Sequence, residues 1–171
     1  GAYQVIVSSV QATPTPTITG TRPPTATPTT PPPGWHSLEL SDGLGGYTGT
    51  TDTWINEWDP NRNYGSANTM DVRSGEHMST LIRFELPPIP ADALVVDASL
   101  HLWAISRSNT YSLPVDVHRV VRPWSENEAN WYLAAQGALW QEPGALGAAD
   151  HNPVVETTVT LDQLNTMYSV N

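Results

Sequence analysis

The side chains best suited to chemistry gather in one polar loop, residues 59–68. Within it Asp59, Asn61 and Asn63 place oxygen-bearing side chains at alternate positions ahead of Gly65, a spacing typical of calcium-binding loops. The glycine comes one position late for an EF-hand, and no glutamate occupies the twelfth position. A turn held by Asp and Asn side chains explains the same residues. The sequence therefore predicts no firm cofactor, with calcium at this loop as the one candidate.

Two aromatic residues, Trp58 and Tyr64, accompany the polar loop. Aromatic ring faces stack on sugar rings in lectin-like sites, so we expect these two residues at any carbohydrate contact. Buried tryptophans are commoner than exposed ones, so we expect five other tryptophans to lie in the core. These are Trp54, Trp103, Trp124, Trp131 and Trp140.

No pattern in the sequence predicts an enzyme. Glu126 and Glu128 could face the same way on a strand as a glycosidase pair does, but β-sandwiches display many such pairs without a cleft between them. The five histidines have no metal-binding spacing, and neither a Gly-x-Ser-x-Gly elbow nor a glycine-rich phosphate loop occurs.

The composition restricts partners and location. Seven arginines, no lysine and seventeen carboxylates give a net charge of -10, which repels nucleic-acid phosphates and anionic lipid. There is no cysteine, which excludes disulfides. No apolar run is long enough to cross a bilayer, and a start at Gly1 without methionine is the expected result of a removed secretory signal. We therefore expect an extracellular, cell-surface protein that binds no nucleic acid and does not insert into membranes.

The elements that must position these side chains are short strands, best seen in residues 80–103. Polar and apolar residues alternate in both halves of this segment, and prolines force a turn between the halves. The pattern predicts a hairpin with one face in a core. The expected inward residues are Ile82, Phe84 and Leu86, then Val96, Ala98, Leu100 and Leu102.

Further strands are predicted at 52–58, 70–73 and 113–121, and late in the chain at 155–161 and from 168. In the late strand Val155, Thr157, Val159 and Leu161 form the expected inward face. Residues 122–152 follow no regular pattern, and 128–136 is the one segment considered for a helix. Many short strands separated by turns predict an all-β fold, an antiparallel β-sandwich of jelly-roll type, over residues 35–171.

Two segments precede this domain. Residues 1–11 have apolar side chains on both faces and predict a strand that needs cover on both sides. Residues 12–34 are rich in threonine and proline and predict an extended linker. Its threonines resemble O-glycan acceptors. They are Thr13, Thr15, Thr17, Thr19, Thr21, Thr25, Thr27, Thr29 and Thr30.

The run from Asp52 to Trp131 resembles the disaggregatase-related, or DNRLRE, repeat family. The matching pieces are DTWI at 52–55, NYG at 63–65, LIRFEL at 81–86 with IP at 89–90, SLHLW at 99–103, V-x-V and W-S-E within 115–126, and Trp131. The resemblance implies an extracellular β-sandwich similar to carbohydrate-binding modules. The family usually continues with another strand beyond the position of Tyr168, whereas this sequence stops at Asn171. That difference predicts an open sheet edge.

A sandwich short of one strand and an N-terminal strand without a sheet complement each other. We therefore expect a subunit of a pilus-like filament, a head-to-tail homopolymer in which residues 1–11 complete the sandwich of the next subunit. The residues expected in this contact are Tyr3, Val5, Ile6, Val7 and Val10. The alternative is a secreted carbohydrate-binding module on a glycosylated stalk, with polysaccharide as its partner.

Overall fold

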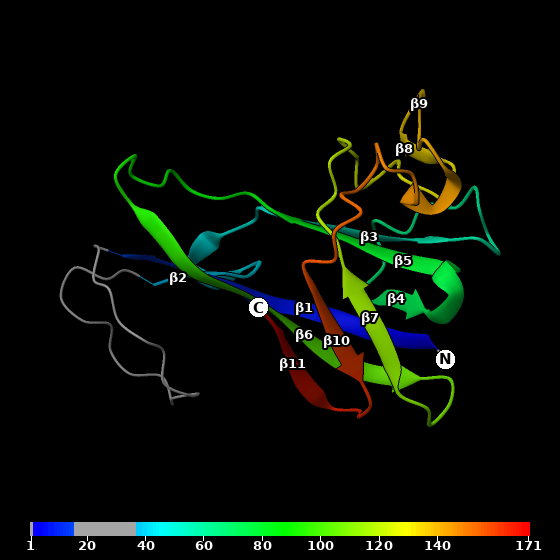
Figure 1. Cartoon of the computed structure of the whole chain (residues 1–171), viewed down its shortest axis with the longest axis horizontal. Coiled ribbons are helices and arrows are strands. Elements are labelled where there is room, and N and C mark those ends of the chain that lie inside the picture. Colours follow the sequence, from blue (N-terminus) through cyan, green and yellow to red (C-terminus); the bar gives the residue numbers. More distant parts are fainter. Residues whose placement is uncertain (1, 16–36) are drawn as a thin grey trace.

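The computed structural model describes residues 2–15 and 37–171 and has the all-β, antiparallel sandwich architecture that the sequence predicts (Figure 1). Over these residues the helical content is three short 3₁₀ turns: η1 (Leu44–Gly46), η2 (Ser74–Glu76) and η3 (Pro143–Ala145). The prediction of a helix over 128–136 is wrong. Asn130 Oδ1 there accepts the backbone N–H groups of Tyr132 and Leu133, which turns the chain into a short strand.

The main sheet has seven strands, all paired antiparallel. Its order is β11 (Thr166–Val170), β6 (Leu94–Arg107), β1 (Ala2–Thr15), β4 (Met70–Arg73), β5 (Met78–Phe84) and β3 (Thr50–Asn56), and β2 (Leu38–Leu40) pairs with the far part of β1. In front of it lies a two-stranded sheet of β7 (Leu113–Val117) and β10 (Thr157–Leu161) (Figure 1). A third pair, β8 (Leu133–Ala135) and β9 (Ala138–Leu139), lies at one end of the sandwich.

The N-terminal strand β1 lies inside the sheet of its own chain. Its backbone pairs with β6 from Tyr3 to Thr15 along one edge, and with β4 and β2 along the other. All five residues expected to contact a neighbour belong to this strand. The strand also continues four residues beyond the predicted boundary at residue 11, while residues 16–34 of the predicted linker lie outside the described residues. The structure therefore offers no support for donation of β1 to another subunit.

Two apolar clusters form the core. One lies between β6, β11 and the front sheet, around Leu102, Leu113, Leu161 and Val170. The other joins Ile55 and Leu81 of the main sheet to the segment that follows β7. Trp124, Trp131 and Trp140 are buried in this second cluster, as the sequence predicts, but Trp103 of β6, also expected in the core, is 39% exposed.

The inward faces of the strands differ in part from those predicted. In β5 the deepest residue is Leu81, which is 4% exposed, because the tryptophan-rich segment covers its side of the strand. Ile82 and Phe84 are only partly buried, and Leu86 is exposed. The first half of β6 extends past the front sheet (Figure 1), which leaves Val96 and Ala98 exposed; Val155 precedes β10 and is exposed as well.

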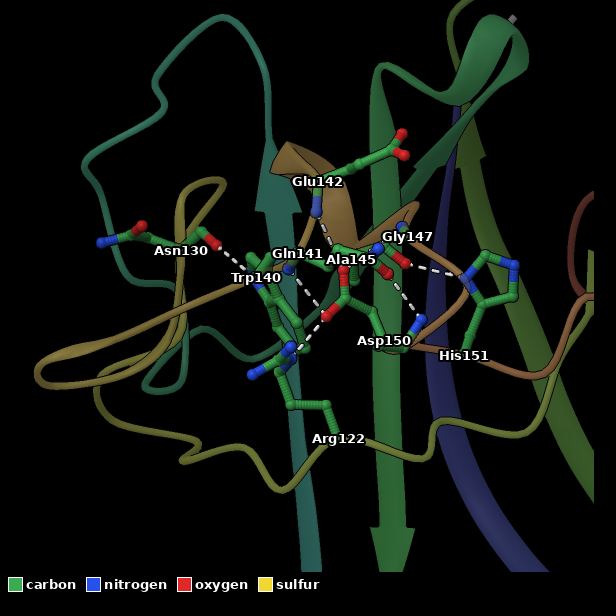
Figure 2. A network of polar contacts seen from close by, with 10 residues as sticks. Arg122, Asn130, Trp140, Gln141, Glu142, Ala145, Gly147, Asp150 and His151 are labelled. Atoms are coloured by element: carbon green, nitrogen blue, oxygen red, sulfur yellow. Dashed lines mark hydrogen bonds and ion pairs between the residues drawn. The ribbon is translucent and has the colours of Figure 1, made fainter.

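Asp150 organises the irregular segment 122–152. This carboxylate is fully buried, and one oxygen accepts from Arg122 Nε and from the backbone N–H of Gln141 at 2.9 Å. The other oxygen accepts from the backbone N–H groups of Glu142 at 3.1 Å and Gly147 at 3.2 Å (Figure 2). Burial acts to raise the pKa of Asp150, but these donors outweigh it and hold the pKa below its ordinary value. One ionised side chain thus fixes a loop that has little regular structure.

Candidate functional site

The turn after β3 carries Trp58 to the surface. Asn56, the last residue of β3, is buried, and its Oδ1 accepts the backbone N–H of Trp58 at 2.9 Å. The backbone N–H of Glu57 donates to the carbonyl of His77 at 3.0 Å, which ties this turn to the one between β4 and β5. As a result, 56% of Trp58 is exposed.

Charged and aromatic groups surround the Trp58 ring. The Arg73 guanidinium carbon lies 4.3 Å from the ring centroid, and the His77 ring is stacked at 5.5 Å with an angle of 27° between planes. The Glu57 carboxylate contacts Nδ1 of His77. We call Glu57, Trp58, Arg73 and His77 the Trp58 platform. It combines an apolar ring with hydrogen-bond donors and an acceptor that reach solvent.

Tyr64 holds the polar loop together. Its ring stacks on Trp54 at 3.7 Å, and the guanidinium of Arg62 lies 4.8 Å from its centroid. Its hydroxyl donates to Asp59 at 3.3 Å and accepts from Asn56 at 3.4 Å. Of the two aromatic residues selected from the sequence, Trp58 therefore presents its ring to solvent, whereas Tyr64 packs within the loop.

The side chains predicted as calcium ligands do not share a common partner. Asp59 accepts the Tyr64 hydroxyl and lies 3.8 Å from Arg62. Asn63 donates to two backbone carbonyls, those of Glu126 at 2.6 Å and Ala129 at 2.8 Å, and its oxygen accepts the N–H of Gly65. Asn61 is exposed. Across residues 2–15 and 37–171, no three His, Asp or Glu side chains gather in a way that could hold a metal ion. Calcium binding at this loop stays a prediction.

Both carboxylates considered as a glycosidase pair cap backbone groups. Glu126 accepts the N–H of Asp52 at 3.0 Å, and Glu128 accepts the N–H of Gln136 at 3.1 Å. Burial raises the pKa of Asp52, and the negative charges of Glu126 and Asp42 raise it further. The Asp52 side chain is only partly buried, and these contacts describe a loop anchor.

The structure adds Arg73 and His77 to the residues that the sequence indicated. Their approach to Trp58 depends on the register of β3, β4 and β5, which no local pattern reveals. The one usable signal was the position of Arg73 at the end of a predicted strand, next to a glycine-containing turn.

A cavity of about 670 Å³ lies between the main sheet and the front sheet, and Arg73 of the platform is part of its lining. Its lining includes Val72, Leu100, Leu113 and Val117 but not Trp58. Trp58 itself is exposed and lies outside the lining of this cavity.

The remaining predicted site residues are distributed as follows. Thr13 and Thr15 belong to β1, and the other seven candidate glycosylation sites lie outside the described residues. In the part of the chain that the structure describes, no helix has the length and apolar character needed to span a membrane.

Comparison with known families identifies a match over the segment that carries the site. The model of carbohydrate-binding module family 96 matches residues 46–137, just over half of the chain. The matched segment contains the whole Trp58 platform and the polar loop. No curated protein and no solved structure matches the chain.

Proposed function

The chain belongs to carbohydrate-binding module family 96, and from this membership we propose that it is a polysaccharide-binding module without catalytic activity whose contact surface is the Trp58 platform. The observation that carries the proposal is the exposed Trp58 ring, which lies beside Arg73 and His77 inside the matched segment. A pyranose ring has an apolar face that can stack on such a ring, while its hydroxyls can bond to Glu57 and Arg73.

Arg73 gives the platform a cation that can pair with an acidic sugar, beside the Glu57 carboxylate. The chain as a whole carries a net charge of -10, yet the Arg73 guanidinium lies against the exposed Trp58 ring. A guanidinium binds a carboxylate through two parallel hydrogen bonds, which suits a uronic-acid residue. We therefore propose a uronate-containing chain as the ligand.

Affinity electrophoresis and calorimetry with a polyuronate and a neutral glucan test this proposal. Trp58→Ala should weaken polyuronate binding at least about tenfold, equivalent to about 1.4 kcal/mol. Arg73→Gln should weaken binding of the polyuronate more than that of the glucan. Tyr111→Ala, at an exposed aromatic outside the platform, serves as the matched control. Unchanged binding by Trp58→Ala protein would remove the platform from the proposal.

Two finer assignments rest on the sequence alone. The order of the matching motifs within 52–131 supports a relationship to the disaggregatase-related repeat family. Secretion to the cell surface agrees with a module that meets polysaccharide outside the cell. Detection of the native protein in a surface fraction tests the second of these.

A filament subunit, predicted from the sequence, is the second candidate; because β1 pairs with strands of its own chain, a filament requires this strand to be exchanged between copies. β1 is an interior strand, and residues 16–36 join it to β2. An equivalent β1 from another copy could make the same backbone pairs, because strand exchange preserves every partner. A head-to-tail series of such exchanges gives an open polymer.

An engineered disulfide distinguishes a closed monomer from an exchanged polymer. The natural chain has no cysteine, and Gln11 of β1 is the register partner of Glu39 of β2. Paired antiparallel positions have Cα atoms about 4.5–5.5 Å apart, within the range of a disulfide. In Gln11→Cys/Glu39→Cys protein, a ladder of disulfide-linked oligomers on a denaturing gel supports exchange. A cross-linked monomer alone contradicts it.

A further inference from the structure

Two histidines line the cavity between the sheets, outside the Trp58 platform. His118 directly follows β7, and His151 lies in the loop before β10. Their ring centroids are 4.7 Å apart, with the rings edge to face at 66°. Both side chains are partly buried. The platform and the proposed sugar contact make no use of this pair.

Backbone pairing brings the segment after β7 next to the loop before β10. His151 is the antiparallel partner of Val120, and the N–H of Asn152 donates to the carbonyl of Arg119 at 2.8 Å. Val120 itself packs against the tryptophan cluster, so this bridge anchors the segment that carries His118 beside the loop that carries His151.

The hydrogen bonds of the two rings fix their tautomers. Nδ1 of His118 lies 3.0 Å from the carbonyl oxygen of Asn152, and Nδ1 of His151 lies 2.9 Å from that of Ala145 (Figure 2 shows the second contact). A carbonyl oxygen can only accept, so each neutral ring carries its proton on Nδ1 and an unshared electron pair on Nε2. Among the described residues no group forms a hydrogen bond with either Nε2.

The carbonyl that fixes His151 is itself held in an unusual turn. Gly144 has φ of 84° and Ala145 has φ of 61°, in the left-handed region that non-glycine residues rarely adopt. The turn is held by the N–H of Gly144, which donates to the carbonyl of Trp131 at 2.7 Å. The orientation of His151 is therefore built into the fold.

We propose that His118 and His151 bind a divalent late transition-metal ion, such as Zn²⁺, through their Nε2 atoms. A ring that donates Nδ1–H to a backbone carbonyl and leaves Nε2 unprotonated has the orientation typical of metal-bound histidine. Imidazole nitrogen suits Zn²⁺, Cu²⁺ and Ni²⁺, while calcium and magnesium require oxygen ligands. Asp116, which also lines the cavity, accepts the hydroxyl of Thr158 at 2.6 Å. Water completes the coordination of a site with two protein ligands.

Calorimetric titration of the full chain with Zn²⁺ in a non-coordinating buffer tests the site. His118→Gln and His151→Gln should each raise the dissociation constant at least about tenfold, and the double variant should lose binding at this site. His101→Gln, at a histidine of β6 outside the cavity lining, is the matched control and should stay close to wild type. Equal affinity of the wild type and the double variant would overturn the proposal.

Nitrogen NMR of the wild-type chain provides a second measurement that needs no variant. Before the metal is added, both rings should show a protonated Nδ1 and an unprotonated Nε2. Zn²⁺ should shift the Nε2 resonances of both rings and leave Nδ1 protonated. If the variants fail to fold, Nε2 signals that do not respond to Zn²⁺ at saturating concentration refute the site.

Discussion

Replacement of Asp150 by asparagine should destabilise the domain strongly although it changes almost no volume. Each carboxylate oxygen accepts two hydrogen bonds. Of the four donors, one is Arg122 Nε and three are backbone N–H groups. An amide keeps one accepting oxygen and directs an NH₂ group at two donors. Two buried donors then lose their partner, at about 1–3 kcal/mol each, which gives a loss of about 2–6 kcal/mol in the free energy of unfolding. Asp150→Asn thus tests whether this residue organises the loop.

Urea unfolding followed by tryptophan fluorescence measures the effect, since Trp124, Trp131 and Trp140 are buried in the cluster that this loop helps to form. With a denaturant slope of about 1–3 kcal/mol/M, the expected loss moves the midpoint by about 1 M or more. Glu142→Gln is the matched control, because its exposed side chain leaves the backbone N–H to Asp150 intact. A change below about 0.5 kcal/mol in Asp150→Asn, the size of an ordinary surface substitution, would refute the reasoning.

The same residue predicts a pH dependence. The pKa of Asp150 is lower in the folded chain than its ordinary value, so the folded state binds this proton less readily than the unfolded state. Its stabilising contribution is complete above the unfolded pKa of about 3.9 and is lost as the pH falls toward the folded-state pKa. The difference in the free energy of unfolding between wild type and Asp150→Asn should therefore become smaller below about pH 4.

Asp52 should show the opposite pH dependence, because its pKa is raised in the folded chain. Its contribution to the stability of the fold is complete below the unfolded pKa and is lost as the pH rises through the folded-state pKa. Asp52→Asn should thus be more stable than wild type at pH 7 and equal to it near about pH 3, and equal stability at both values contradicts this. Gly65→Ala should destabilise by about 1–3 kcal/mol, since its Cβ would lie 2.2 Å from the carbonyl oxygen of Glu126; a wild-type melting temperature would show that the loop can move aside. Native protein should exceed the bare mass of 18.6 kDa if the threonines of residues 13–30 carry O-glycans, and intact-mass spectrometry measures this.

The strands were predictable because each depends on a local alternation of polar and apolar residues. β4 has the predicted bounds, and the other predicted strands correspond to observed ones with ends shifted by a few residues. The burial of Trp124, Trp131 and Trp140 was also predictable, since large apolar side chains stabilise a core wherever the chain folds back. The inward faces were less predictable. A loop without periodicity covers the Leu81 side of β5, while half of β6 lies beyond the front sheet.

The sequence by itself determined that the chain is an acidic, cysteine-free β-sandwich with an aromatic residue beside a polar loop. The tertiary structure decided which sheet receives the N-terminal strand, because the apolar pattern of that strand suits its own sheet and a neighbour's equally well. It also decided that Arg73 and His77 meet Trp58, and that His118 meets His151. Such contacts follow from the register and crossing of distant segments. The free energy of those pairings depends on the whole assembled sheet, so no local stretch of sequence specifies them.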